Sequence, residues 1–293
     1  MVKFMNIKKI YILFKIIKSK NSIAYSILIY ELLRLILLPL NIFFSLIEKI
    51  FLKQKKIDNV PIIFVVGLHR SGATYIAQVL LRELNVYGLN NINNIFNKCP
   101  IIITKILKKM LINIKSFGPI KNFYGQTKNI FDINDNHQVW DQWFGPNHEH
   151  IESYYLDRAV GINEYFAGIY NIIKKPILSK NGRNIFAIEK LDSIFKKSLF
   201  IIVDRDAEKI SLSTKKANFF FFNNKYSWGL KQDPELLDDE KQILLINNSI
   251  KQSVSKLKSG KFYKIKYEDF VDENKQKIII KEIKDRVYNL DVQ

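Results

Sequence analysis

One segment constrains the fold of this chain more than any other: an apolar β-branched run, a loop and a helical pattern follow one another over residues 60–80. The run ends at Gly67, the loop extends to Gly72, and the helical pattern begins at Thr74. Such a loop gathers backbone N–H groups at the positive end of a helix dipole, where an anion binds favourably. The sequence therefore predicts a strand–loop–helix unit with an anion-binding loop.

The spacing of this loop is close to that of a Walker A motif, with Gly67, four further residues, Gly72 and then Thr74. The Walker lysine would stand at position 73, which is Ala73. The nearest cation is Arg70, whose guanidinium can bind a tetrahedral oxyanion through two hydrogen bonds. We therefore expect an anion other than a magnesium-bound nucleoside triphosphate. A P-loop kinase for a small molecule is the alternative.

A second pattern of the same kind follows the apolar run 199–203. Arg205 stands at the carboxyl end of this predicted strand, Asp206 can cap the helix that follows, and Ser213 lies about two turns along it. Ligands of open α/β sheets bind outside the carboxyl ends of the strands. Arg205 therefore stands at the edge of the predicted sheet where a ligand would bind.

These two patterns resemble the phosphate-binding motifs of sulfotransferases. Members of that family transfer a sulfuryl group from 3′-phosphoadenosine 5′-phosphosulfate (PAPS) to an acceptor hydroxyl or amine without a metal. Their 5′-phosphosulfate loop is often written Gly-x-Pro-Arg-Ser-Gly-Thr-Thr. The matching residues of this chain are Gly67, Arg70, Ser71, Gly72 and Thr74. The resemblance implies that these residues bind the donor, with Tyr75 near its adenine and with Arg205 and Ser213 at its 3′-phosphate.

The resemblance covers residues 60–275 and has two departures inside the loop. His69 stands where Pro is frequent, and Ala73, which we keep among the donor-binding positions, stands where the first Thr is expected. The second departure removes one hydroxyl from the loop and points to a lower donor affinity. By the same resemblance Lys180 is a strand-end lysine that points at the transferring sulfuryl group. A solvated loop lysine is the alternative for Lys180.

Sulfuryl transfer also needs a base that takes the proton of the acceptor as its oxygen attacks. The best local candidates are His137 and Asp141, which are four residues apart and share one face of a predicted short helix, with Glu149 behind them. The alternative is that Trp140 and Trp143 pack this helix while His137 and Asp141 form an exposed pair. We expect no metal site, because no cysteine or additional histidine completes a set with the histidines of this region.

The alternation of apolar runs with helical sequence predicts an α/β, P-loop-like three-layer fold. We expect a central, mostly parallel sheet of four or five strands with helices on both faces. The candidate strands are Ile62 to Val66, Ile177 to Ser179, Leu199 to Val203 and Phe262 to Tyr267. The last of these is expected to be a central strand that leads into a capped helix, with a structural role.

Residues 1–57 are expected to form an apolar and basic helical arm, and residues 58–293 the catalytic domain. The longest uncharged stretch of the arm, residues 35–47, is shorter than the roughly 20 residues of a membrane-spanning helix. No small-residue cleavage site follows it, so we expect no secretory signal. Its flanking lysines suit an anionic lipid surface. Two interpretations stay open: a helical hairpin packed on the domain or on a second subunit, and interfacial contact with a membrane.

Composition adds few constraints. The net charge of the 293 residues is +18, which attracts polyanions nonspecifically, but no nucleic-acid-binding signature accompanies it. The single Cys99 fits a reducing compartment. We therefore expect a cytoplasmic protein, peripheral at the inner face of the membrane in the second interpretation of the arm. By the resemblance, we expect the acceptor to be a small molecule, a glycan or a lipid. A non-catalytic protein that binds nucleotides, glycans or a membrane surface with the same fold is a further alternative.

Overall fold

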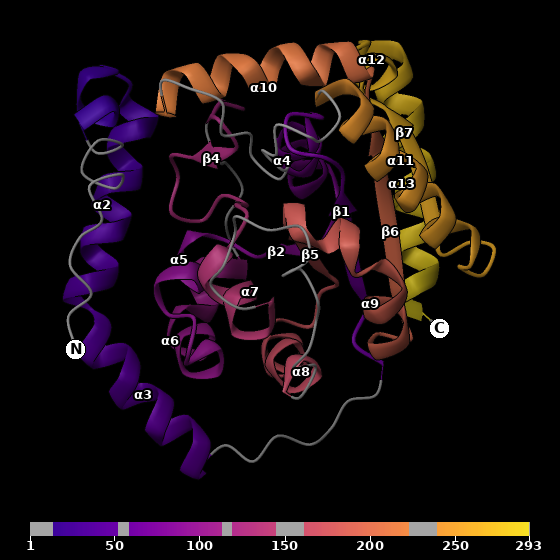
Figure 1. The fold of residues 1–293 in the computed structure, drawn as a ribbon. Helices are drawn as coiled ribbons and strands as arrows, with labels where there is room; N and C mark the ends of the chain where they lie inside the picture. Colours follow the sequence, from indigo (N-terminus) through magenta and orange to yellow (C-terminus); the bar gives the residue numbers. More distant parts are fainter. Residues whose placement is uncertain (1–13, 52–58, 113–118, 145–160, 223–238, 293) are drawn as a thin grey trace.

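The computed structural model describes residues 14–51, 59–112, 119–144, 161–222 and 239–292. Its centre is a five-stranded sheet in the order β2-β5-β1-β6-β7, in which all neighbouring strands are parallel (Figure 1). The strands are β1 (Ile62–Val66), β2 (Tyr87–Gly88), β5 (Ile177–Lys180), β6 (Ser198–Asp204) and β7 (Phe262–Lys266). The predicted parallel sheet is therefore confirmed, but β7 is an edge strand and its predicted central position is wrong.

Two hydrophobic clusters lie on opposite faces of this sheet and make the fold three-layered. Along β1, Phe64 belongs to one cluster, while Ile63 and Val65 belong to the other, as the alternation of side chains along a strand requires. The cluster around Phe64 includes residues of α7 (His137–Phe144), α8 (Ile162–Ile173), α9 (Ile188–Ile194) and α11 (Asp239–Ser255). The opposite cluster includes residues of α4 (Ala73–Glu83), α12 (Tyr267–Phe270) and α13 (Glu273–Val292).

Because all five strands run in parallel, their carboxyl ends meet at one edge of the sheet. The predicted site residues lie in the loops at this edge, at the end of β5 and on the helices α4, α7 and α10 (Ala207–Phe222). Asp206 caps α10 as predicted, since its carboxylate accepts a hydrogen bond from the backbone N–H of Lys209. The remaining elements are α5 (Asn91–Ile95), α6 (Pro100–Ile112), β3 (Asn122–Phe123), β4 (Gln126–Thr127) and the 3-10 helix Gly182–Phe186.

The described part of the arm consists mainly of α2 (Ser22–Ile36) and α3 (Leu38–Phe51), which stand along one side of the domain (Figure 1). The two helices are bent by 58° at their junction, so α2 and α3 do not form a hairpin with each other. Residues 1–13 of the predicted arm lie outside the described residues. α2 lies against α5 and the β3–β4 hairpin, and α3 lies against α6. Within the described ranges, no single helix is long and apolar enough to cross a membrane; α2 and α3 meet that criterion only when taken as one bent pair.

Candidate active site

The loop after β1 turns tightly because two of its positions lack a side chain. A Cβ atom on Gly67 would lie 2.7 Å from Ser71 Oγ. Gly72 has a φ of +94°, and a Cβ atom there would lie 2.2 Å from the ring of Tyr267. α4 begins directly after Gly72, at Ala73, and in the described structure no side chain caps its first backbone N–H groups. The predicted strand–loop–helix unit is confirmed, and its helix starts with N–H groups that can donate hydrogen bonds to an anion.

Arg70 and Arg205 from the two predicted motifs, 135 positions apart, meet beside this loop. Nη1 of Arg205 donates a hydrogen bond of 2.8 Å to the backbone oxygen of Arg70. Nε of Arg70 donates a hydrogen bond of 3.0 Å to Ser213 Oγ. Each guanidinium also lies over an aromatic ring, Arg70 at 5.2 Å from the ring centre of Tyr124 and Arg205 at 4.6 Å from that of Tyr267. The structure thus brings Arg70, Arg205 and Ser213 into one cluster.

This cluster carries positive charge that no carboxylate of the described residues neutralises through an ion pair. Desolvation lowers the pKa of Arg70; the ring of Tyr124 opposes this effect, and the neighbouring charge of Arg205 adds to it. Two buried hydrogen-bond donors, Ser71 Oγ and Arg205 Nε, have no partner among the residues that the structure covers. Buried donors of this kind normally have an acceptor. The composition of the cluster therefore fits an anionic ligand.

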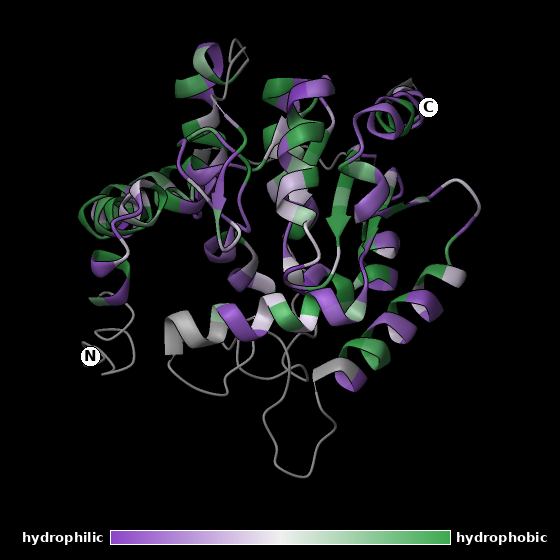
Figure 2. Cartoon of the chain, turned by 90° about the horizontal axis from the view of Figure 1, so that it is seen from above, coloured by the Kyte–Doolittle hydropathy of each residue, from purple (hydrophilic) through white to green (hydrophobic). Residues whose placement is uncertain are grey.

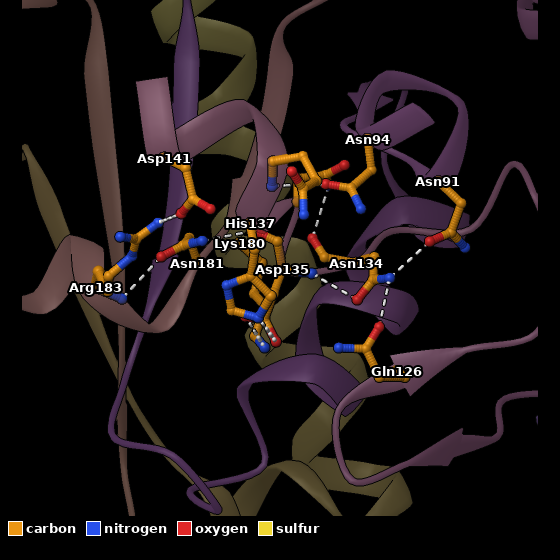
Figure 3. A network of polar contacts seen from close by, with 12 residues as sticks. Asn91, Asn94, Gln126, Asn134, Asp135, His137, Asp141, Lys180, Asn181 and Arg183 are labelled. Carbon is orange, nitrogen blue, oxygen red and sulfur yellow. Dashed lines mark hydrogen bonds and ion pairs between the residues drawn. The ribbon is translucent and has the colours of Figure 1, made fainter. Parts of the chain in front are cut away.

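Lys180 ends β5, as predicted, and forms a second polar cluster with Asp135 (Figure 3). Its Nζ lies 2.5 Å from Asp135 Oδ1, and Asp135 Oδ2 lies 4.0 Å from Nε2 of His137. Burial raises the pKa of Asp135, but the charges of Lys180, His137 and His69 outweigh it and lower the pKa to about 2. Asp135 is therefore ionised at neutral pH and holds Lys180 in place. The sequence did not predict this contact of Asp135, because nothing in it distinguishes Asp135 from the polar residues on either side.

His69, which departs from the family pattern, lies against the loop after β5. A Cβ atom on Gly182 would lie 2.7 Å from Cε1 of His69, so Gly182 leaves room for the imidazole. Desolvation is the main cause that lowers the pKa of His69 to about 4, and the charge of Asp135 only partly opposes it. His69 is therefore neutral at pH 7.

The β3–β4 hairpin links the two clusters. Its two turn residues, Tyr124 and Gly125, have φ angles of +50° and +89°, as in a tight turn of type I′. Tyr124 covers Arg70, as described above. A Cβ atom on Gly125 would lie 3.5 Å from Oγ1 of Thr74, 3.6 Å from Asp135 and 4.0 Å from Nζ of Lys180. The turn therefore sits over the start of α4 and over the Lys180–Asp135 pair at the same time.

Asp141 has a different partner from His137, although α7 contains both. It forms an ion pair with Arg183, whose guanidinium is buried and lies 5.0 Å from the ring centre of Phe144. Trp140 is buried, as expected for a residue that packs this helix. The ion pair gives Asp141 a structural contact, and its role as a base stays a prediction. Glu149 lies outside the described residues.

The remaining residues predicted to bind the sulfuryl donor lie in the first turn of α4. Ala73 and Thr74 are buried in the first turn of α4. Tyr75 lies edge-on to Tyr267 and Phe270, with ring centres 6.3 and 6.1 Å away. Tyr75 is thus part of an aromatic group beside the loop, and its contact with an adenine stays a prediction.

Comparisons with known proteins agree with the α/β fold described above. A family model described as "Sulfotransferase family" matches residues 61–279. Sulfotransferase STF1 from Mycobacterium tuberculosis H37Rv has a similar structure, with a TM-score of 0.52 and 14% identity over 85% of this chain and 76% of that one. Sulfotransferase STF9 from Mycobacterium avium gives a TM-score of 0.48 and 15% identity, over 80% of this chain and 68% of that one. No curated protein matches the chain. At these identities the likeness to STF1 shows the fold alone.

Proposed function

The chain belongs to the sulfotransferase family, and we propose that it transfers a sulfuryl group from PAPS to an acceptor hydroxyl or amine by in-line displacement. The acceptor belongs to a small molecule, a glycan or a lipid. The S–O bond to the bridging phosphate oxygen breaks as the acceptor oxygen or nitrogen bonds to sulfur, and the acceptor proton passes to a base. The donor leaves as 3′-phosphoadenosine 5′-phosphate (PAP).

One observation carries this proposal: two guanidiniums, Arg70 and Arg205, are held side by side without an ion-paired carboxylate among the described residues. Holding like charges together in a desolvated place is unfavourable unless an anion binds there. The donor has anionic groups at both ends of its nucleoside. We assign Arg70, Ser71 and the first N–H groups of α4 to its 5′ end, and Arg205 with Ser213 to its 3′-phosphate.

The same residues account for catalysis. As the sulfuryl group departs, negative charge grows on the bridging oxygen, and preorganised donors stabilise this charge. In this assignment Arg70, Thr74 and the N–H groups of α4 stabilise this charge. Lys180, at the end of the neighbouring strand, assists them and is held by its 2.5 Å contact with Asp135. Donors of this kind typically lower a barrier by about 3 to 4 kcal/mol each.

His137 is our choice for the base. A carboxylate with a pKa of about 2, such as Asp135, is a weak proton acceptor at neutral pH. Asp135 is instead placed to stabilise the imidazolium that forms, since its Oδ2 lies 4.0 Å from Nε2 of His137. In this assignment His137 is catalytic and Asp135 is a positioning residue for both Lys180 and His137.

The test combines calorimetry with PAP and a sulfuryl-transfer assay with PAPS and a panel of phenolic, sugar and lipid acceptors. Arg70→Ala is expected to abolish turnover. Arg205→Ala is expected to weaken PAP binding by roughly 10- to 150-fold, the equivalent of about 1.5 to 3 kcal/mol for a hydrogen bond to a charged group. Arg286→Ala is the matched control, because Arg286 also donates to backbone oxygens and lies 5.2 Å from a tyrosine ring centre, on α13.

Wild-type kinetics in Arg70→Ala, or unchanged PAP affinity in Arg205→Ala, would contradict the assignment. Binding of PAP without transfer to any acceptor of the panel would instead favour a non-catalytic nucleotide-binding protein. Magnesium-dependent phosphoryl transfer from ATP would favour the kinase alternative.

A further inference from the structure

α3 has its polar side toward the protein and its apolar side outward. The side chains of Asn41, Ser45 and Glu48 are buried, and their spacing places them on one face of the helix. On the other side, Phe43 is 57% and Ile50 is 66% exposed. A helix of a globular protein normally has the reverse arrangement. An apolar face turned outward needs a partner that is itself apolar.

The buried polar residues attach α3 firmly to the domain. Asn41 donates to the backbone oxygen of Ile95 and accepts a hydrogen bond from the backbone N–H of Lys98. One carboxylate oxygen of Glu48 accepts hydrogen bonds of 3.1 Å from the backbone N–H groups of Ile101 and Ile102, and so caps the first turn of α6. These contacts fix which side of α3 faces out.

α2 continues the apolar surface. Its exposed apolar residues recur at helical spacing, and we name them together with those of α3 the arm face: Ile29, Leu32, Leu35, Ile36, Ile42, Phe43, Leu46 and Ile50. In Figure 2 the two arm helices, at the left as in Figure 1, are mostly green along the edge of the molecule. The inner side of α2 is occupied, since Ala24 packs with Phe123 and Tyr124 of the hairpin over the active site.

The charged residues in the described part of the arm are mostly cationic. Lys15, Lys18, Lys20 and Lys49 lie in the described part of the arm. Of the two acids there, Glu31 forms an ion pair of 2.7 Å with Arg34, and Glu48 is buried. A surface that combines exposed apolar side chains with a border of lysines is typical of helices that lie in the headgroup region of an anionic bilayer.

We propose that the arm face docks on the surface of an anionic membrane, with α2 and α3 lying along the bilayer and the domain outside it. A second copy of the chain is a poorer occupant, because it would bring two lysine borders and two molecules of net charge +18 together. Spanning the bilayer is also disfavoured, because Asn41 and Glu48 tie α3 to the domain. The docked membrane lies beside the hairpin over the active site.

Flotation of the full chain with vesicles tests the proposal, using phosphatidylcholine alone and phosphatidylcholine mixed with phosphatidylglycerol. The test variant carries Phe43→Gln, Leu46→Gln and Ile50→Gln. The matched control carries Leu244→Gln, Leu245→Gln and Ile278→Gln, which replace apolar residues of α11 and α13 that are 52–60% exposed. Neither variant touches the active site or the residues that anchor α3, so both are expected to keep the circular dichroism and PAP affinity of the wild type.

We expect the wild type and the control to bind the anionic vesicles, weakly in high salt, and to be released by alkaline carbonate. The test variant is expected to lose at least about tenfold in partitioning. Equal binding of the test variant and the wild type would overturn the proposal, as would absence of wild-type binding. If the wild type sediments as a dimer and the test variant as a monomer, the proposal is overturned in favour of a second copy on the arm face. If carbonate does not release the bound wild type, it is overturned in favour of insertion into the bilayer.

Discussion

Substitution of Gly72 by alanine tests the packing that positions Arg205. Gly72 has a φ of +94°, and a Cβ atom there would lie 2.2 Å from two ring carbons of Tyr267. The ring would have to move by roughly 1 Å to reach the 3.4 Å at which ordinary contact begins. The same ring lies under the guanidinium of Arg205, at 4.6 Å from ring centre to Cζ. Gly72→Ala should therefore disturb Arg205 although the two residues are not neighbours in sequence.

The expected loss of stability has two parts. An alanine at positive φ costs about 1 to 2 kcal/mol in backbone strain. Displacing the ring from Arg205 costs about 1 to 2 kcal/mol more, the size of a partly desolvated cation–π contact. Gly72→Ala is thus expected to lower the free energy of unfolding by about 2 to 4 kcal/mol. A displaced Arg205 should also raise the dissociation constant of PAP by roughly tenfold, which corresponds to about 1.4 kcal/mol.

Gly260→Ala is the control, because Gly260 has a φ of +90° and a Cβ atom there would have no neighbour within 4 Å. It should lose only the backbone part, about 1 to 2 kcal/mol, and keep the wild-type affinity for PAP. Urea unfolding and calorimetry measure the two quantities. Equal losses of stability in the two variants, with PAP affinity unchanged in both, would refute the argument that Gly72 and Arg205 confine the ring of Tyr267.

Two further predictions concern buried charges. Lys180→Met leaves the carboxylate of Asp135 without its lysine partner and should lower the free energy of unfolding by about 3 to 5 kcal/mol. The double variant Lys180→Met/Asp135→Asn should regain most of this stability in urea unfolding but should not regain turnover. Equal losses of stability in the two variants would contradict the pairing of Lys180 with Asp135. Burial raises the pKa of Glu48 from 4.5 to about 7, so its protonation favours the folded state: this stabilisation is complete below pH 4.5 and is lost as the pH rises through 7. Glu48→Gln should remove that part of the pH dependence of unfolding, and an unchanged profile would show that Glu48 is not buried as described.

The strands β1 and β6 were predictable because they are buried on both faces, which leaves continuous apolar runs rich in β-branched residues in the sequence. These are the run before Gly67 and the run before Arg205, and both became central strands. β2 was missed because two residues, Tyr87 and Gly88, are too short to form a pattern. The central position predicted for β7 was wrong for a related reason: hydropathy indicates that a segment is a strand, but its neighbours in the sheet depend on contacts that are distant in sequence.

The site was predictable only where a motif fixed the spacing. Arg70, Arg205 and Ser213 stand at fixed positions after a strand, and the structure brings them together. Asp135 has no such position: it lies in a loop that a network of amide side chains holds in place, in which Asn134 donates to Asn91 and to Gln126 (Figure 3). Polar residues in an irregular segment give no periodic signal, so the pairing of Asp135 with Lys180 required coordinates.

The arm shows why hydropathy alone does not tell which side of a helix faces the protein. The apolar and polar residues of α3 alternate with a helical period, which predicts a helix with two unlike faces. The usual rule would turn Phe43 and Leu46 inward and Glu48 outward. The rule fails because the domain presents polar backbone groups at that place. The N–H groups of Ile101 and Ile102, at the start of α6, donate hydrogen bonds to the carboxylate of Glu48. The apolar face is then left outside, where only an apolar partner can cover it.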